Sequence, residues 1–409
     1  MKNRLTPERA ILFTKLSVAL TCSWPPSSLA TKAQHLFFNV LWCIAFLTAV
    51  TLFLPLLAAI YEYRKHSIIL GKTVSLTAAV AQVTIKMIIC RLQQKPFQVS
   101  SLLSVLYSEM ENFCKQATNE EKIILQRYVD RYKYFHSFYI LWSFLTTIFV
   151  ICSPLYTAQT FPTHAIYPFS VRHHPYKGLI FFHQSFVGFQ VSSGMAVDTQ
   201  IALLLRYAAA RFEILGIQFN NAKSDGEFDA CIEKHNELLR HTREIRRSIR
   251  YLILATNGTT VIAVIFGSLN LIANQPLALK ALYTIVVFSA SVELFMYAWP
   301  ADSLMHMTMK MATKVYNMDW YRRDIRTQRK ILFIILRSQK YESFGINGIV
   351  PALSLSYYGK VLCLFYFFTR DNCYYLILFR IYPFIVLQYL YTSLSYFNAL
   401  RIMVEDTVN

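Results

Sequence analysis

The sequence predicts an all-α membrane protein with seven transmembrane helices, a cytoplasmic N-terminus and an extracellular C-terminus. Of its 409 residues, 55% are hydrophobic and 15% aromatic, with a mean hydropathy of +0.35, a balance that water-soluble globular chains rarely sustain. Residues 36–60 and 251–279 contain no Lys, Arg, Asp or Glu. Each of these stretches exceeds the roughly 20 residues that a helix needs to cross a bilayer. The long continuous apolar runs favour helices as the spanning elements.

The individual spans follow from hydropathy averaged over about 19 residues. We expect crossings at 36–60, 68–90, 134–156, 178–205, 251–273 and 278–300, and a last one beginning near 347. The first 35 residues show no cleavable signal peptide, because polar residues interrupt their short apolar part. This N-terminal segment is therefore expected in or near the cytoplasmic interface.

The orientation of the spans comes from the distribution of basic residues. Of the 41 Lys and Arg residues, 28 lie in segments 1–34, 91–131, 207–250 and 301–346, whereas six lie in the segments on the other side. Because cytoplasmic loops carry the excess of Lys and Arg, the first set of segments is expected in the cytoplasm. The same distribution accounts for the net charge of +18 without a nucleic-acid partner, since the basic residues form no single compact patch.

The polar segments between the later spans are themselves patterned as helices. Within 228–250, the apolar residues Ile232, Leu239, Ile245 and Ile249 recur at helical spacing among charged residues. Segment 303–340 shows a similar polar pattern and ends in KILFIILRSQK. We expect transmembrane helices that continue into the cytoplasm and pack there as a bundle, including between subunits; the alternative is a set of solvated helices.

The sequence offers little for catalysis or metal binding. The eight cysteines are dispersed, which argues against a disulfide framework or a metal site. His164, His173, His174 and His183 cluster around the fourth span, but no Cys, Asp or Glu joins them, so a solvated loop is favoured over a metal site. No nucleophile elbow, catalytic dyad or cofactor fingerprint is present. We therefore expect neither an enzyme nor a cofactor.

Three ionisable residues fall inside predicted spans. Lys86, Asp198 and Glu293 lie in spans two, four and six, where charges are costly and usually face the bundle or a wet cavity. Local pairing or snorkelling to the interface is favoured slightly over a direct role in an ion pathway.

The C-terminal third carries a family resemblance. Residues 293–340 read ELFMYAWPADSLMHMTMKMATKVYNMDWYRRDIRTQRKILFIILRSQK, and residues 393–401 read SLSYFNALR. The Glu-Leu-Phe start, the Asp-Trp-Tyr block, the Arg-Ser-Gln-Lys block and the final Ser-Tyr-Phe resemble the signature of insect odorant receptors. The seven inverted spans and long cytoplasmic helices agree, and the 172–215 region resembles members from ants, wasps or bees.

The resemblance implies an odorant-sensing tuning subunit of a tetrameric, ligand-gated, non-selective cation channel. Its partner would be the odorant receptor co-receptor, in the plasma membrane of an olfactory neuron dendrite. Residues 1–300 would form the transmembrane bundle, 301–346 a cytoplasmic anchor helix and 347–409 the pore helix. Asp319, Trp320 and Tyr321 would belong to the assembly anchor, and Ala399, Ile402 and Met403 to the pore and gate.

The resemblance also places the odorant pocket in the outer half of the bundle, between spans two, three, four and six. An odorant is small and apolar, so an aromatic and aliphatic lining is expected. The residues predicted to form it are Leu76, Ala79, Val83, Phe144, Thr147, Ile148, Phe182, Phe186, Phe189, Tyr283 and Val287.

One stretch departs from the family pattern. Residues 361–388 read VLCLFYFFTRDNCYYLILFRIYPFIVLQ, and joining Lys360 directly to Tyr389 restores a continuous last helix. That helix would hold 28 residues, from 347–360 and 389–402, or about 42 Å. The stretch is interpreted as a translated retained intron, because it is in frame, begins with Val, ends with Gln and is rich in Phe, Tyr, Ile and Leu. A genuine extra membrane hairpin is the rival interpretation.

Other function classes remain open. A gustatory-type relative, a receptor for cuticular hydrocarbons or pheromones, or a non-functional splice form would share most of these features. The Ser-Tyr-Phe ending favours the odorant branch. The inverted topology disfavours a metabotropic receptor, and the absence of internal repeats disfavours a transporter.

Overall fold

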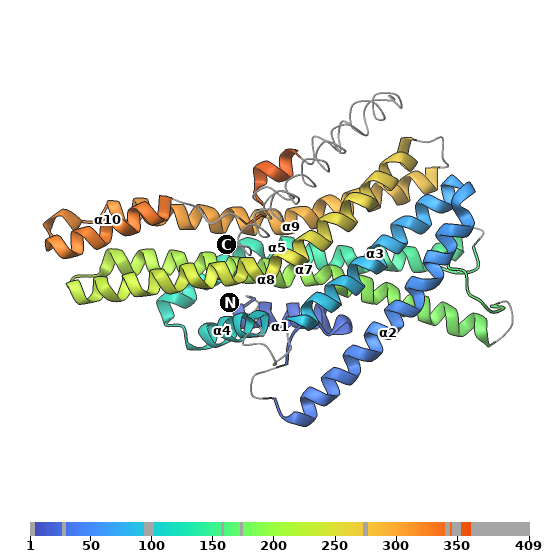
Figure 1. Ribbon diagram of the computed structural model, residues 1–409, viewed down its shortest axis with the longest axis horizontal. Coiled ribbons are helices and arrows are strands. Elements are labelled where there is room, and N and C mark those ends of the chain that lie inside the picture. Colours follow the sequence, from blue (N-terminus) through green and yellow to red (C-terminus); the bar gives the residue numbers. More distant parts are fainter. Residues whose placement is uncertain are drawn as a thin grey trace, which may run out of the picture.

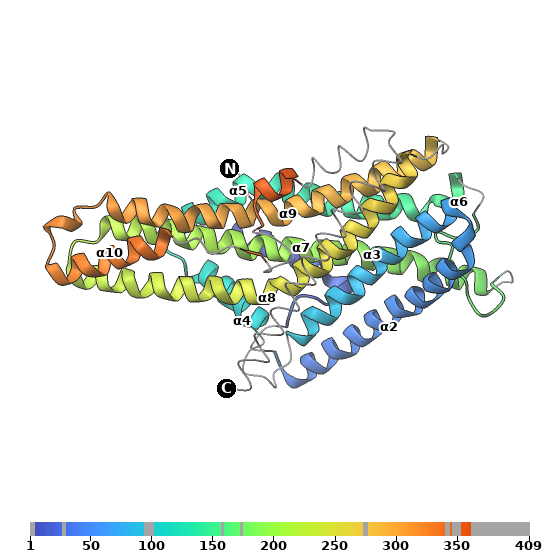
Figure 2. The same cartoon turned by 45° about the horizontal axis from the view of Figure 1, so that its top comes forward.

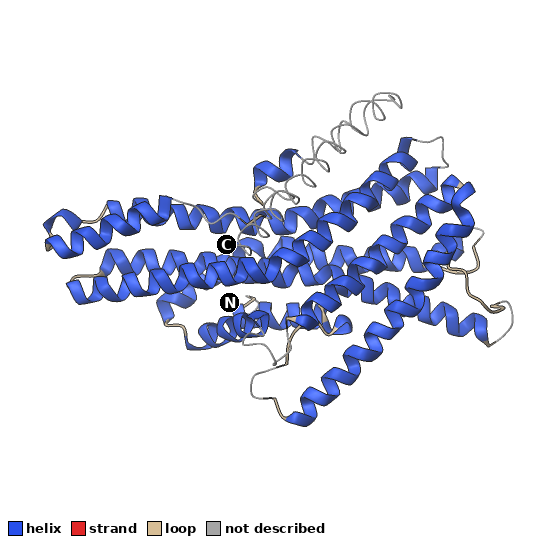
Figure 3. Ribbon diagram, viewed as in Figure 1, coloured by secondary structure: helices blue, strands red, loops and turns tan. Residues whose placement is uncertain are grey.

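The computed structural model describes residues 5–26, 30–93, 102–156, 159–171, 175–272, 277–339, 344–345 and 353–360. Over these residues the chain is an elongated bundle of helices and contains no strand (Figure 3). The predicted all-α fold class is therefore confirmed. The predicted insertion 361–388 lies outside the described residues, as do Ala399, Ile402 and Met403.

Six long helices make up most of the bundle, and shorter elements connect or cover them. The long helices are α2 (Lys32–Glu62), α3 (Ser67–Leu92), α5 (Asn119–Ile151), α7 (Tyr176–Asn221), α8 (Asp225–Ile272) and α9 (Leu277–Tyr316). The shorter helices are α1 (Pro7–Ser17), α4 (Leu102–Gln116), α6 (Ser153–Tyr156) and α10 (Ile325–Gln339). Within the described residues the order also includes three 3₁₀ turns: η1 (Ala19–Thr21), η2 (Tyr63–Lys65) and η3 (Trp320–Arg322).

Two of the long helices begin at capping boxes that the sequence encodes. At α2, Gln34 donates its backbone N–H to Thr31 Oγ1 at 3.3 Å, and Gln34 Oε1 accepts from the Thr31 backbone N–H at 2.9 Å. Thr118 and Glu121 repeat the arrangement at α5. Each box satisfies two backbone donors that a helix start leaves free. This start extends α5 well upstream of the predicted span 134–156.

Helix α7 is the central element of the bundle. It packs against α9, α5, α8 and α3 (Figures 1 and 2), and residues 192–210 are buried almost without interruption. Small side chains such as Ser192, Gly194, Ala202 and Ala208 occupy much of this stretch. They allow the neighbouring helices to approach closely, as is typical of packing between membrane helices.

Four described helical segments are long and apolar enough to cross a membrane: Lys32–Lys65, Ile69–Leu92, Asn119–Ile151 and Tyr283–Tyr316. Helices α7 and α8 are also helical over the predicted spans 178–205 and 251–273. The lower hydropathy of α7 has a structural cause. Because α7 is enclosed by other helices rather than by lipid, it buries polar residues such as Gln190, Asp198 and Gln200.

The end of the bundle that contains α10 is formed by helical extensions. Helices α7, α8 and α9 each continue beyond their predicted spans, and α10 folds back against α9 and α8 (Figure 2). Residues 301–346, predicted as one anchor helix, hold the end of α9, η3 and α10 instead. The helix stops because η3, which begins just after Asp319, turns the chain between α9 and α10.

The contact between α3 and α7 depends on a glycine. A Cβ atom at Gly194 would lie 3.0 Å from Val83 Cβ and closer still to its methyl groups. We expect Gly194→Ala to lower the free energy of unfolding by about 1–3 kcal/mol through overpacking. Thermal denaturation of the detergent-solubilised protein checks this. Val83→Ala should restore part of the loss in the double variant, and no rescue would contradict the proposed clash.

Candidate functional site

A cavity of about 180 Å³ lies within the half of the bundle away from α10. Helices α2, α3, α5, α7, α8 and α9 all contribute to its wall. The apolar part of the lining includes Leu52, Leu56, Leu76, Ala78, Ala79, Val80, Phe149, Val150, Ile151, Val191, Met195, Ala263, Ile285, Val286 and Ala290. In another protein, a dry apolar cavity of about 150 Å³ holds a benzene molecule. The cavity can therefore accept a small organic molecule.

The cavity exists because small residues face one another across it. Ala78 and Ala79 lie on α3, and Gly188 lies on the facing helix α7. A Cβ at Gly188 would approach Thr147 Cγ2 to 3.2 Å, so this backbone forms part of the cavity wall directly. Larger side chains at these positions would occupy the space, since helix interfaces otherwise pack to high density.

One end of the cavity is polar and is formed by Glu293. Its Oε2 accepts from Thr260 Oγ1 at 3.1 Å, and its Oε1 accepts from Gln82 Nε2. Gln82, Thr260 and Glu293 all line the cavity. A bound molecule would therefore meet a mostly apolar wall with a few polar groups that can orient it.

Glu293 belongs to a buried ionic network that joins three helices. Lys86 Nζ lies 2.6 Å from Asp198 Oδ1 and 3.2 Å from Glu293 Oε1, and all three side chains are at most 4% exposed. The charges that the sequence placed in spans two, four and six thus pair with one another. One ammonium faces two carboxylates, so removing it would leave two buried acidic groups without a cation.

Two tyrosines complete the network around Asp198. The Tyr139 hydroxyl donates to Asp198 Oδ2 at 2.9 Å, and the Tyr297 hydroxyl donates to Oδ1. Thr256 Oγ1 in turn lies 3.1 Å from the Tyr297 oxygen. Donors from α3, α5 and α9 therefore converge on one carboxylate of α7. Such convergence fixes how the four helices are rotated relative to one another.

The loop 159–171 contributes to the cavity wall. Pro162 and Thr163 line the cavity, and the Thr163 backbone N–H donates to Gln184 Oε1 at 3.1 Å. The Ile166 backbone N–H donates to the Pro55 carbonyl at 3.1 Å. These bonds attach the loop to α7 and α2.

His164 belongs to this loop and is neutral. Burial, aided by the nearby charge of Lys72, lowers its pKa to about 4. Lys72 Nζ donates to Gln159 Oε1 at 2.9 Å, and Gln159 Nε2 lies 2.6 Å from His164 Nε2. Because the amide nitrogen is a donor, His164 Nε2 accepts, and a neutral imidazole is required.

Acid should therefore weaken the loop. The folded-state pKa of His164 lies below the ordinary value of about 6.5, so the unfolded chain binds the proton more tightly. Folding stability contributed by neutral His164 is lost as the pH falls from about 6.5 towards 4. We expect the melting temperature to fall less between pH 7 and pH 5 in His164→Gln than in the wild type. Equal falls in both proteins would contradict this assignment.

The predicted pocket residues divide into two groups. Leu76, Ala79 and Thr147 line the cavity. The others lie outside its lining: Val83, Phe144, Ile148, Phe182, Phe186, Phe189, Tyr283 and Val287. Val83 packs with Ala45 and Met87, and Phe144 packs against Phe189 with ring centroids 6.4 Å apart. Ile148 and Phe182 are 46% and 70% exposed on the outside of the bundle.

The histidine cluster divides in a similar way. His173 and His174 lie outside the described residues. His183 contacts Thr51 Oγ1 at 3.0 Å and the Thr48 carbonyl at 3.1 Å, away from the partners of His164. Among the described residues, no group of three or more His, Cys, Asp or Glu side chains is arranged to hold a metal ion.

The predicted anchor residues lie at the turn between α9 and α10. Trp320 Nε1 donates to the Tyr316 carbonyl at 3.2 Å, and the Tyr321 hydroxyl donates to Asp319 Oδ1 at 3.2 Å. Tyr321 is 58% exposed. These residues shape the turn and leave an aromatic surface at the tip of the bundle.

Several residues of the cavity wall were not expected from the sequence. Leu52 and Leu56 of α2 were not expected, because only spans two, three, four and six were considered. Gln184 lies in span four, but an aromatic and aliphatic lining was expected there. Glu293 was singled out for its charge but not for its place in the cavity wall. Its position near small residues on neighbouring spans was the available signal.

The fold is thus a helical bundle around a mostly apolar cavity with a polar end, and this cavity has room for a small organic molecule. The chain matches the 7tm Odorant receptor family over residues 69–366. It belongs to that family.

Curated relatives agree with this family. Odorant receptor 22c of Drosophila melanogaster is 23% identical over 32% of this chain and 33% of its own length. Odorant receptor 10 of Aedes albopictus is 24% identical over 41% of this chain and 44% of its own length. The matches to these two relatives thus span less than half of their length. Odorant receptor 47b of Drosophila melanogaster is 22% identical over 90% of each chain.

Solved structures share the fold. The insect olfactory receptor OR5 from Machilis hrabei superposes with a TM-score of 0.74 at 13% identity, covering 91% of this chain and 98% of that one. The same receptor in complex with eugenol gives a TM-score of 0.72 at 13% identity, covering 89% of this chain and 98% of that one. The helical architecture of this chain is therefore that of an insect olfactory receptor.

Proposed function

We propose that this chain is the odorant-sensing subunit of a ligand-gated, non-selective cation channel formed with the odorant receptor co-receptor. The observation that carries the proposal is the cavity between α3, α5, α7 and α9, with its mostly apolar wall and single acidic end. A receptor of the same fold has been solved with eugenol, which supports a small organic ligand here. A site of this kind favours the receptor state that fits the ligand and shifts its population.

The test is co-expression with the co-receptor and recording of odour-evoked current from cells. A panel of small aromatic and aliphatic volatiles should include compounds that open the channel. Full-length chain and a variant lacking 361–388 should be compared, because we propose that the functional last helix joins Lys360 to Tyr389. Current from the full-length form alone would overturn the proposal about 361–388 and leave the receptor assignment intact.

We further propose that α10 and the η3 turn join the subunits on the cytoplasmic side. Ile331 and Ile334 face the interior, at 0% and 2% exposure. Phe333 and Leu336 on the other face are 66% and 65% exposed. An exposed apolar face on a charged helix is typical of an interaction surface.

A charge on this face should weaken assembly. We expect Phe333→Asp to reduce co-precipitation with the co-receptor by about tenfold, because a buried unpaired carboxylate costs more than 1.4 kcal/mol. Gln339→Asp introduces the same charge at an exposed polar position of α10 and should leave assembly unchanged. Equal recovery of both variants would argue against α10 as the contact.

A further inference from the structure

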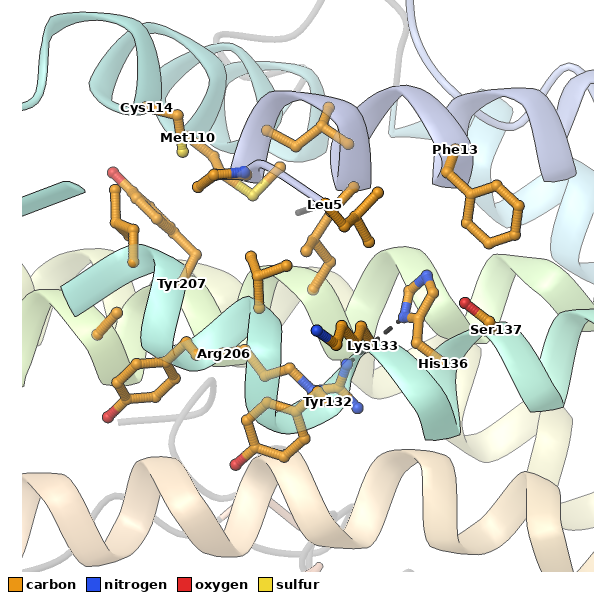
Figure 4. A pocket seen from close by; sticks show the side chains of 18 residues that line it. Leu5, Phe13, Met110, Cys114, Tyr132, Lys133, His136, Ser137, Arg206 and Tyr207 are labelled. Atoms are coloured by element: carbon orange, nitrogen blue, oxygen red, sulfur yellow. Dashed lines mark hydrogen bonds between the residues drawn. The ribbon is translucent and has the colours of Figure 1, made fainter. Parts of the chain in front are cut away.

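A second cavity, of about 60 Å³, lies between α1, α4, α5 and α7 and is separate from the proposed odorant site (Figure 4). Its wall is mostly apolar and includes Leu5, Ile11, Met110, Leu125 and Leu203. One charged side chain, Arg206 of α7, reaches into this apolar space (Figure 4). Arg206 is only 5% exposed.

The guanidinium of Arg206 is partly satisfied. Its Nη1 donates to His136 Nδ1 at 3.4 Å, and the group lies 4.0 Å from the centre of the Tyr132 ring. His136 Nε2 then lies 3.0 Å from Thr14 Oγ1, which donates to the Ala10 carbonyl at 2.9 Å. A neutral His136 that accepts at Nδ1 and donates at Nε2 fits this chain of hydrogen bonds. The network connects α7 through α5 to α1.

Two donors of the same guanidinium have no partner. Nε and Nη2 of Arg206 are buried and make no hydrogen bond within the described part of the chain. No described carboxylate forms an ion pair with Arg206. Lys133, at the rim, pairs with Asp130 at 2.9 Å, and Glu213 pairs with Arg127 at 2.9 Å. Burying a charge without a counter-charge costs several kcal/mol, so an anion bound beside Arg206 would stabilise its guanidinium.

The free donors specify the shape of that anion. Nε–H and Nη2–H lie on the same edge of the planar guanidinium and point in parallel, the arrangement that binds two oxygens of a carboxylate or phosphate. Two neutral acceptors would satisfy the hydrogen bonds but not the charge.

The surroundings indicate that the anion is attached to an apolar chain. Most of the cavity wall is apolar, whereas a hydrated inorganic ion would need polar partners on every side. Partly exposed Phe13, Val129 and Ser137 form the rim between α1 and α5. Beyond it, these two helices present exposed apolar residues, among them Leu16 at 67% and Phe138 at 42%. An alkyl chain leaving the cavity would meet this surface.

We propose that this cavity binds the oxyanion head of an acidic amphiphile through Nε and Nη2 of Arg206, with the alkyl chain leaving between α1 and α5. The ligand fastens the N-terminal helix to α5 and α7. An acidic membrane phospholipid and a free fatty acid carry the same chemistry. The location at the end of α5 that carries basic residues places the head near a membrane surface.

Photolabelling of the full chain, co-expressed with the co-receptor, tests the proposal. Membranes receive three probes with the same photoreactive acyl chain: phosphatidic acid, the free fatty acid and the uncharged diacylglycerol. Labelled peptides are then identified by mass spectrometry. We expect an acidic probe to label Pro7–Ser17 or residues 129–137 at least about tenfold more strongly than diacylglycerol, as charged hydrogen bonds imply. Labelling by phosphatidic acid or by the fatty acid identifies the source.

Variants separate the site from general lipid contact. Arg206→Gln should lower labelling about tenfold, and Ala10→Phe should do so by filling the cavity. Arg127→Gln, which removes an exposed arginine of α5, should leave it unchanged. If Arg206→Gln fails to fold, two comparisons still test the proposal. One is the labelling of Ala10→Phe, and the other is the labelling of the wild type by acidic and by uncharged probes. Equal labelling by all three probes, or unchanged labelling in the folded variants, would overturn the proposal.

Discussion

Replacing Lys86 by Met should prevent most of the receptor from reaching the cell surface. The substitution keeps an unbranched side chain but removes the ammonium that lies 2.6 Å from Asp198 and 3.2 Å from Glu293. Two carboxylates would then remain buried without a cation. Breaking a buried ion pair from one side typically costs about 3–5 kcal/mol, which is a large part of the stability of a protein. Surface biotinylation and the melting temperature of solubilised receptor measure the loss.

Glu293→Gln is the matched control for this prediction. It removes the second negative charge from a network that has only one cation. The amide oxygen can still accept from Lys86 and Gln82, and the amide nitrogen can donate to Thr260. We expect a melting temperature close to that of the wild type. Equal surface levels of Lys86→Met and Glu293→Gln would contradict the view that the ammonium holds the network together.

The ion network shows what a single sequence can and cannot provide. Each of its three charges is identifiable from sequence, since a charge within an apolar stretch is conspicuous. That the three charges pair with one another cannot be read from the sequence, because the pairing depends on how α3, α7 and α9 are rotated in the bundle. The tyrosines that donate to Asp198 give no sequence signal, since Tyr139 and Tyr297 are unremarkable in an aromatic-rich chain.

The helices themselves were largely predictable, because an apolar stretch of sufficient length has few alternatives in a membrane. Their full lengths were harder to predict. Hydropathy placed the third span at 134–156, whereas α5 begins at Asn119. The polar first turns of α5 are invisible to hydropathy, although the capping box at Thr118 and Glu121 marks them. Local hydrogen bonding, rather than burial, sets that boundary.

The cavity residues were the least predictable part. Aromatic residues such as Phe182, Phe186 and Phe189 were expected to line the cavity, yet they lie outside its lining. Phe189 packs against Phe144, and Phe182 is exposed on the outside of the bundle. A cavity remains where small residues face each other. Ala78, Ala79 and Gly188 are such residues. A search of facing spans for small residues near a buried polar group would have been the better guide.

Filling the cavity should silence the response to odorants while the receptor still reaches the membrane. Ala79 lies on α3 in the cavity wall, and Ala79→Phe would place a ring in the space of about 180 Å³ that a ligand needs. Even one excess methylene group in a fitted site changes affinity by about tenfold to two-hundredfold. We therefore expect the half-maximal odorant concentration to rise at least about a hundredfold, or the odour-evoked current to disappear.

The same substitution at Ala58 controls for the added ring. Ala58 lies on α2, which also contributes to the cavity, but its side chain is exposed on the outer surface. Ala58→Phe should keep the wild-type odour response and surface level. Because the ring enters an existing space, Ala79→Phe should also keep its surface level, which separates a blocked site from a misfolded receptor. An unchanged dose–response curve for Ala79→Phe would place the odorant elsewhere in the bundle.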